Sequence, residues 1–258
     1  MRLLVTNDDG VPAPGLIAVA RHLRDVGHDV LVVGPTDDCS GSSAAVGPIR
    51  MDEGVPVVPM RLPGLDGIPA WAIDAPPALC VMAAVLGGFG PAPELVVSGV
   101  NRGPNTGASV LHSGTVGAAL AGANFGVSGV AVSLAWGEPT FLETAVAVAA
   151  STLGWLSGEP AGTVLNVNVP NRALEACAGV CWAPLARFGT VRAALRGGES
   201  DAPVLEIQGD GEPAAGDDSS DTAMLAAGYV TVTSVVGVQA APESDAPQAM
   251  AQALVGLG

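Results

Sequence analysis

Short apolar runs alternate with stretches of helical periodicity from the first residues of the chain. The run RLLVT (2–6) predicts a buried parallel strand, because it is apolar on both faces. A helix beginning near Gly15 follows, in which apolar residues recur every three or four positions: Leu16, Val19, Ala20, Leu23 and Val26. Gly27 is suited to end that helix, and DVLVVGP (29–35) predicts a second strand. The chain therefore opens as a β-α-β unit.

The same alternation continues to about residue 170. Segments 94–100, 129–135 and 163–170 read as strands, whereas 77–86, 113–126 and 140–156 read as helices. Residues 49–73 suggest a short β excursion. Such a pattern predicts a mainly parallel sheet covered by helices on both faces.

Beyond residue 170 the pattern changes to short β-like runs. These runs are 180–185, 188–195 and 203–208, followed by an acidic loop (209–221), a strand (229–236) and a helix (244–256). We expect one domain over residues 1–258, with a core of 1–170 and a C-terminal extension of 171–258. The segment 180–208 is interpreted as a β-hairpin arm suited to oligomerisation.

Charge and composition narrow the class of partner. The 258 residues include 25 acidic side chains and ten basic ones, all of them Arg, which gives a formal net charge of -15. Nucleic-acid polymers are excluded as partners, because binding them needs a basic stripe. A small anion is still possible, since a bound dication reverses the sign of the local field.

Neither a zinc centre nor a membrane segment is expected. The four cysteines lack the paired spacing and the His cluster of zinc sites, so they read as reduced and mostly buried thiols. Residues 1–10 read as a strand and turn rather than a signal peptide. The uncharged stretch 103–137 is interrupted by Gly, Pro, Asn and Ser, which argues against a membrane span. We expect a cytoplasmic protein.

Three polar clusters directly follow predicted strands: NDDG (7–10), the loop 36–46 and SGVN (98–101). One crevice can collect them, because ligands of open parallel sheets sit at the carboxyl ends of the strands. Asp8 and Asp9 would repel each other unless a cation lay between them, and oxygen ligands favour Mg²⁺, Mn²⁺ or Ca²⁺. The alternative is a solvated turn that caps the following helix.

The stretch SGVNRGPNTGASVLHSGT (98–115) adds a candidate anion site. Asn105 lies in a Gly-rich loop, and Ser113, Gly114 and Thr115 open a helix whose free amides and hydroxyls suit a phosphate. Alternatively, Ser113 is only an N-cap. His112 is either a general acid or a residue lining the site, and Arg102 either contacts phosphate or forms an outer salt bridge.

On these motifs the chain resembles the SurE family of survival proteins, which are 5'/3'-nucleotidases. The matching segments are NDDG with A-P-G (13–15), V-x-P-x-x-x-x-S-G (33–41), SGVNRGPNTG (98–107), HSGTV (112–116), LNVNVP (165–170) and D-x-x-x-x-x-x-G-Y-V (221–230). The chain departs from the family pattern at Ala44 and Ala45, in residues 75–80 and in the ending 232–236.

The resemblance implies a Rossmann-like three-layer α/β/α sandwich with an extended C-terminal arm, assembled as a homodimer or homotetramer. It also implies one divalent cation per subunit, Mg²⁺ or Mn²⁺, held by Asp8, Asp9, Ser40 and Asn101.

We therefore expect a phosphoric monoester hydrolase, a 5'-nucleotidase that cleaves nucleoside 5'- and 3'-monophosphates with a metal-activated water. In this hypothesis Asp8 and Asp9 are catalytic, while Asn105, Ser113, Gly114 and Thr115 bind phosphate. Direct attack by Asp8 or Asp9 on phosphorus is an alternative. Two other functions stay open: hydrolysis of another small phosphate ester or short polyphosphate, and nucleotide binding without catalysis.

Overall fold

The computed structural model describes residues 1–48, 53–187, 192–196, 204–208 and 217–239, together with Ala246 and Met250. Its strands are β1 (Arg2–Thr6), β2 (Asp29–Pro35), β3 (Val57–Pro59), β4 (Ala70–Ile73), β5 (Leu95–Arg102), β6 (Ser128–Leu134), β7 (Val164–Val169), β8 (Val180–Trp182), β9 (Arg192–Arg196), β10 (Val204–Gln208) and β11 (Val230–Val235). Its α-helices are α1 (Pro14–Asp25), α2 (Pro77–Val85), α3 (Gly114–Ala123), α4 (Leu142–Leu156) and α5 (Asp221–Ala226). Two 3₁₀ helices complete the set: η1 (Gly107–His112) and η2 (Leu174–Ala176).

The described residues form one mixed sheet of nine strands in the order β3-β4-β2-β1-β5-β6-β7-β11-β8. Neighbours from β4 to β7 run parallel, β3 and β11 pair antiparallel with β4 and β7, and β8 lies parallel to β11. The predicted, mainly parallel sheet is therefore confirmed.

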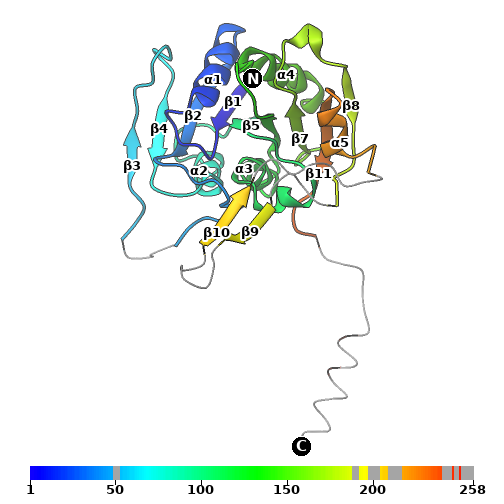
Figure 1. Cartoon of the computed structure of the whole chain (residues 1–258). Helices are drawn as coiled ribbons and strands as arrows, with labels where there is room; N and C mark the ends of the chain where they lie inside the picture. The colour runs from blue at the N-terminus through cyan, green and yellow to red at the C-terminus, as the bar shows by residue number, and fades with distance from the viewer. Residues whose placement is uncertain are drawn as a thin grey trace, which may run out of the picture.

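Helices cover both faces of this sheet (Figure 1). Helices α1 and α4 pack together on one face, and α2 and α3 pack together on the other. The apolar residues of each face pack into separate clusters, because alternate residues of a strand point to opposite faces. In β1, Leu3 and Val5 join the larger core of α1 and α4, whereas Leu4 joins the core that includes α2 residues. The predicted three-layer α/β/α architecture is confirmed.

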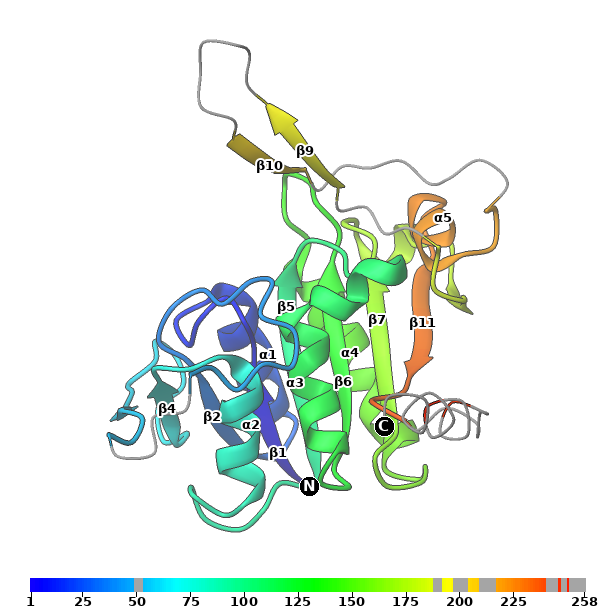
Figure 2. The ribbon, with the colours of Figure 1, turned by 90° about the horizontal axis from the view of Figure 1, so that it is seen from below.

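The C-terminal extension differs from the prediction at β8 and at the start of α5. The run 180–185 was expected in the arm, but β8 belongs to the main sheet, where it hydrogen-bonds with β11. The antiparallel pair β9–β10 alone projects, beyond the edge where the parallel strands end (Figure 2). Helix α5 starts at Asp221, the last residue of the predicted loop, because Ser220 provides an N-cap by accepting a hydrogen bond from Ala223 N.

Several other predictions concern the margins of the fold. The predicted helix 244–256 lies outside the described residues except for Ala246 and Met250, and so does part of the β excursion at 49–52. All four cysteines are free, but only Cys80 is buried, so the expectation of mostly buried thiols is wrong. Among the helices that the structure describes, none has both the length and the hydropathy needed to cross a bilayer.

Candidate active site

The predicted polar clusters lie around the carboxyl end of β1, which is next to the central strand β5. The chain leaves β1 toward β2 on one side and later returns to place β5 on the other, so β1 and β5 flank a topological switch point. Thr6 of β1 pairs with Ser98 of β5. Asp8 and Asp9 follow Thr6, and Asn101 follows Ser98. Neighbouring strands lie about 4.8 Å apart, so these residues share one end of the crevice.

Asp8 is buried, with 3% of its surface exposed, at the start of α3. Its Oδ1 accepts a 2.6 Å hydrogen bond from the Thr115 hydroxyl. Burial raises the pKa of Asp8, while hydrogen bonds from the hydroxyl and backbone of Thr115 lower it. The amino end of α3 is thus partly occupied by a carboxylate of the protein itself.

Gly114 brings α3 close to Asp8. A Cβ on Gly114 would lie 2.7 Å from Asp8 Oδ2 and 2.8 Å from Ser42 Oγ, closer than a real Cβ can approach. Gly114 is therefore required for this helix to approach both the NDDG turn and the 36–46 loop.

Asp9 is half-buried beside two other carboxylates. Burial and the negative charges of Asp8 and Asp38 raise the pKa of Asp9 to about 6. All three effects oppose ionisation, and a cation between the carboxylates would favour the ionised form against them. Carboxylates whose ionisation is opposed in this way are suited to binding a cation.

The 36–46 loop is fixed against both neighbouring segments. Cys39 N–H donates a 2.7 Å hydrogen bond to Asp8 O, which holds the following residue, Ser40, next to the NDDG turn. Ser43 donates from its backbone N–H to His112 O and from its hydroxyl to Leu111 O. Ser40 is exposed, and its backbone N–H is held by Asp38 Oδ1 at 2.8 Å.

Asn101, half-buried at the end of β5, has its side chain oriented by the backbone. Its Nδ2 donates a 2.7 Å hydrogen bond to Gly103 O, so its Oδ1 is the atom suited to a cation. The described residues contain no group of three or more His, Cys, Asp or Glu side chains placed to hold a metal ion. Asp8 and Asp9 would need neutral oxygens to complete a ligand set, and Ser40 and Asn101 supply that type of donor.

A buried polar network fixes Asn105. Its carbonyl oxygen accepts from Asn166 Nδ2 (2.8 Å) and Asn168 Nδ2 (2.9 Å), and its N–H donates to Asn168 Oδ1 (2.7 Å). Its own Nδ2 donates to Ser133 Oγ at 2.8 Å. The sequence analysis did not identify these partners as site residues, although alternating Asn in the apolar strand LNVNVP was a signal that something polar lay above it.

Asp221 is a second residue that the sequence analysis missed. This fully buried carboxylate accepts hydrogen bonds from the backbone N–H groups of Gly107, Ala186 and Thr222, at 2.8 to 2.9 Å. Burial raises its pKa, and these three hydrogen bonds lower it. Asp221 thereby joins the segment after Asn105 to the C-terminal extension.

The contacts of Ser113, Arg102 and His112 bear on the two roles that the sequence left open for each of them. Ser113 Oγ accepts a 3.1 Å hydrogen bond from Val116 N, which makes Ser113 an N-cap, as the alternative interpretation had it. Arg102 forms an exposed ion pair with Glu138 at 2.6 Å. His112 is exposed beside the site.

The fold and these contacts define a doubly wound α/β protein with an acidic, oxygen-rich site at its switch point. The model of the family described as survival protein SurE matches residues 3–203. The chain therefore belongs to the SurE family.

Named relatives match over most of the chain. The 5'-nucleotidase SurE of Rhodopirellula baltica is 38% identical over 241 residues, which cover 90% of this chain and 91% of that protein. The 5'/3'-nucleotidase SurE of Edwardsiella ictaluri is 37% identical over 239 residues, covering 90% and 89%. The crystal structure of the SurE protein from Aquifex aeolicus superposes with a TM-score of 0.74 at 27% identity, covering 92% of this chain and 93% of that one.

Proposed function

We propose that this protein is a divalent-cation-dependent nucleotidase that hydrolyses nucleoside 5'- and 3'-monophosphates to nucleoside and phosphate. The observation that carries the proposal is the pair Asp8 and Asp9 at the switch point, where burial and the negative charges of Asp8 and Asp38 raise the pKa of Asp9 to about 6. Relatives that match nine tenths of the chain are named as nucleotidases, which fits this site.

The donor set fits one hard cation, Mg²⁺ or Mn²⁺, held by Asp8, Asp9, Ser40 and Asn101. All four residues offer oxygen, and the amide nitrogen of Asn101 is already bound to Gly103 O. When bound, the cation supplies a Lewis acid for a phosphoryl oxygen and lowers the pKa of a coordinated water. Thr115 orients Asp8 for this role through its hydroxyl.

Phosphate binding is assigned to Asn105 and to the start of α3. Asn105 Nδ2 carries two N–H bonds, of which one goes to Ser133 and the other can serve a phosphate oxygen. Ser113 accepts from Val116 N and keeps its own proton to donate. Because the Thr115 hydroxyl donates its hydrogen bond to Asp8, its contribution to phosphate binding is indirect. Gly114 has no side chain and contributes only its backbone. These donors suit the charge that spreads over the equatorial oxygens during transfer.

Direct nucleophilic attack by Asp8 is disfavoured by its environment. Its carboxylate is buried, accepts a short hydrogen bond from Thr115, and lies against the backbone of Gly114. A nucleophile needs an unencumbered oxygen, and Asp9, like Asp8, is committed to the proposed cation, so we propose attack by water. Acid quenching during turnover with labelled substrate separates the two routes, because only direct attack leaves labelled protein.

The direct test is phosphate release from a panel of substrates. Nucleoside 5'- and 3'-monophosphates, ribose 5-phosphate and short polyphosphate would each be incubated with EDTA, with Mg²⁺ and with Mn²⁺. We expect release from nucleoside monophosphates that EDTA abolishes and a cation restores. Faster release from the sugar phosphate or polyphosphate would instead favour a different phosphatase, and binding without any release would favour a non-catalytic nucleotide-binding protein.

We further propose that the protein assembles as a homodimer or homotetramer through the C-terminal arm, and that it works in the cytoplasm. The projection of β9–β10 away from the sheet supports the first proposal (Figure 2). Light scattering of the full chain and of a variant lacking residues 188–208 tests it, with a smaller particle expected for the deletion.

A further inference from the structure

An exposed tryptophan packs against Gly103, whose carbonyl oxygen orients Asn101 of the candidate cation site. Trp136 follows β6 and is 56% exposed, although it is among the largest apolar side chains. Its six-membered ring packs on the backbone of Gly103, where a Cβ would lie 2.7 Å from Cε2 and 2.8 Å from Cη2. Gly103 leaves room for the ring, and more than half of Trp136 still faces solvent.

The position of Trp136 relates to both halves of the proposed site. Gly103 O accepts the hydrogen bond from Asn101 Nδ2, so the indole packs on the residue that orients the proposed cation ligand. Three residues before Trp136, Ser133 accepts from Asn105 Nδ2, the proposed phosphate donor. Trp136 therefore lies at the same end of the sheet as Asn101 and Asn105. It is related to Asn101 through Gly103 and to Asn105 through Ser133.

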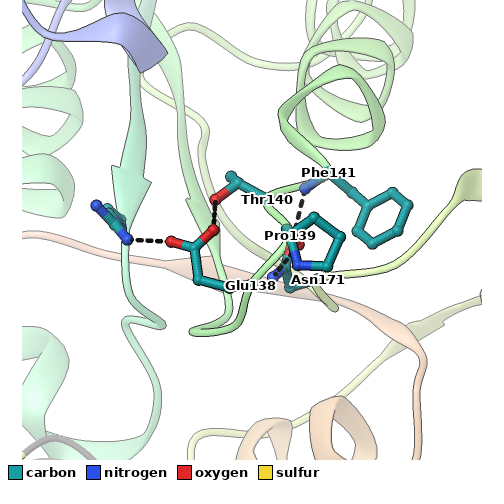
Figure 3. Close-up of polar contacts among 6 residues, drawn as sticks. Glu138, Pro139, Thr140, Phe141 and Asn171 are labelled. Carbon is teal, nitrogen blue, oxygen red and sulfur yellow. Dashed lines mark hydrogen bonds and ion pairs between the residues drawn. The ribbon is translucent and has the colours of Figure 1, made fainter.

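The loop that carries Trp136 is fixed by polar contacts on its far side (Figure 3). Glu138 forms the ion pair with Arg102 and accepts a 3.5 Å hydrogen bond from the Thr140 hydroxyl. Asn171 binds the loop twice, donating from Nδ2 to Pro139 O (3.1 Å) and accepting from Phe141 N (2.8 Å). An aromatic side chain held on a tethered loop can bind a planar group at low entropic cost.

We propose that the indole of Trp136 is the platform on which the nucleobase of the substrate stacks. The inference rests on the proposed nucleotidase function and names the group that gives the site its preference for nucleotides. Base–aromatic stacking tolerates every base because each has a π-face, and a purine offers more area than a pyrimidine. A substrate with its phosphate at Asn105 and the cation has its base one sugar away from them, and Trp136 follows β6 at the same, carboxyl end of the sheet.

Substitution of Trp136, compared with substrates that have or lack a base, tests the inference. We expect Trp136→Ala to raise KM for AMP about tenfold to a hundredfold with little change in kcat, and to raise KM for UMP less. Ribose 5-phosphate, which has no base, should be hydrolysed as by the wild type. Trp136→Phe should recover part of the affinity for AMP.

Trp155→Ala is the matched control. Trp155 is similarly exposed (51%), but it lies in the last turn of α4, where it lines a separate cavity with Leu165 and Trp182. This variant should leave all kinetic constants unchanged. The inference would be overturned if Trp136→Ala had the AMP kinetics of the wild type. It would also be overturned if the variant lost equal activity with AMP and ribose 5-phosphate, or if a general loss of activity came with a changed particle size in light scattering.

Binding separates this inference from the proposed function. AMP would be titrated calorimetrically into the wild type and Trp136→Ala in the presence of Mn²⁺. Weaker binding to the variant supports the platform even if the wild type releases no phosphate, a result that would overturn only the nucleotidase proposal. Equal binding to both proteins overturns the platform whatever the activity.

Discussion

The hydroxyl of Thr115 donates a 2.6 Å hydrogen bond to Asp8 Oδ1, joining the first turn of α3 to the turn after β1. Both residues are buried, so the bond is made away from bulk water. It orients a carboxylate that would otherwise be free to rotate, and it partly offsets the cost of burying charge. In the proposed function Thr115 is thus a support for a cation ligand.

Replacement of Thr115 by Val should weaken cation binding while preserving shape. Loss of an outer partner of a metal ligand typically lowers metal affinity about tenfold to a hundredfold. The same loss removes an influence that lowers the pKa of Asp8, so the pKa should rise and the acid limb of the pH–rate profile should move to higher pH. Mn²⁺ titration and a pH profile check both effects, with Thr115→Ser as the control that keeps the hydroxyl. An unchanged Mn²⁺ affinity in Thr115→Val would contradict the assigned role.

Gly114→Ala should damage the site by steric overlap. The added methyl group would meet Asp8 Oδ2 and Ser42 Oγ, so α3 or the 36–46 loop must shift. Overpacking of this kind costs about 1–3 kcal/mol in the free energy of unfolding, and the proposed activity should be lost with it. Urea denaturation and phosphate release are the measurements.

Gly154→Ala is the control for that substitution. Gly154 lies in α4, and a Cβ there meets nothing within 4 Å. Alanine is favoured over glycine in a helix by up to about 1 kcal/mol, so this variant should be as stable as the wild type or more so, with full activity. Comparable losses in both variants would show that the Gly114 result reflects a general intolerance of helical alanine.

Much of the fold could be predicted from the sequence because the strong local apolar patterns match the residues that the tertiary structure buries. The apolar run of β1 is buried, and α1 buries every residue of its predicted stripe except Val26, which is its exposed C-cap. The short strand β8 was misassigned because its position depends on pairing with β11, about fifty residues later. Three residues carry too little periodicity to reveal such a partner.

The candidate site was predictable only in its outline. Asp8 and Asp9 stand out because adjacent carboxylates after a strand are chemically unusual. Asp221 is noted in the sequence only as the first residue of the D-x-x-x-x-x-x-G-Y-V motif, and its place at the end of an acidic loop suggests a solvated side chain. Its role appears only when Gly107 and Ala186, 114 and 35 residues away, donate to it. Long-range backbone donors leave no mark on a local sequence pattern.

Asp221→Asn should destabilise the protein strongly. Asp221 accepts hydrogen bonds from three backbone N–H groups through its two carboxylate oxygens. Asparagine has only one such oxygen, and its NH₂ group would face a backbone N–H that also needs an acceptor. We expect a loss of about 2–4 kcal/mol in the free energy of unfolding, measured in urea. Asp66→Asn, at an exposed turn, is the control and should change little. A loss of less than about 0.5 kcal/mol in Asp221→Asn would contradict the anchoring role.

Asp9→Asn should separate stability from activity. The pKa of Asp9 is about 6 when folded and lower when unfolded, so the folded state binds more protons, and the stability of the cation-free protein falls as pH rises from about 4 to 6. Asparagine removes this loss. In EDTA at pH 7 the variant should therefore melt at a higher temperature than the wild type, yet release little phosphate with Mn²⁺. A lower melting temperature in EDTA would mean that Asp9 stabilises the fold rather than waits for a cation.

The central claim is that Asp8, Asp9, Ser40 and Asn101 hold one divalent cation. Electron paramagnetic resonance titration of Mn²⁺ counts the bound ions directly, in the wild type and in Asp8→Asn, which retains the oxygen that Thr115 contacts. The account predicts one tightly bound Mn²⁺ per wild-type chain and its loss from folded Asp8→Asn. Equal tight binding to both proteins, or none to the wild type, would contradict it.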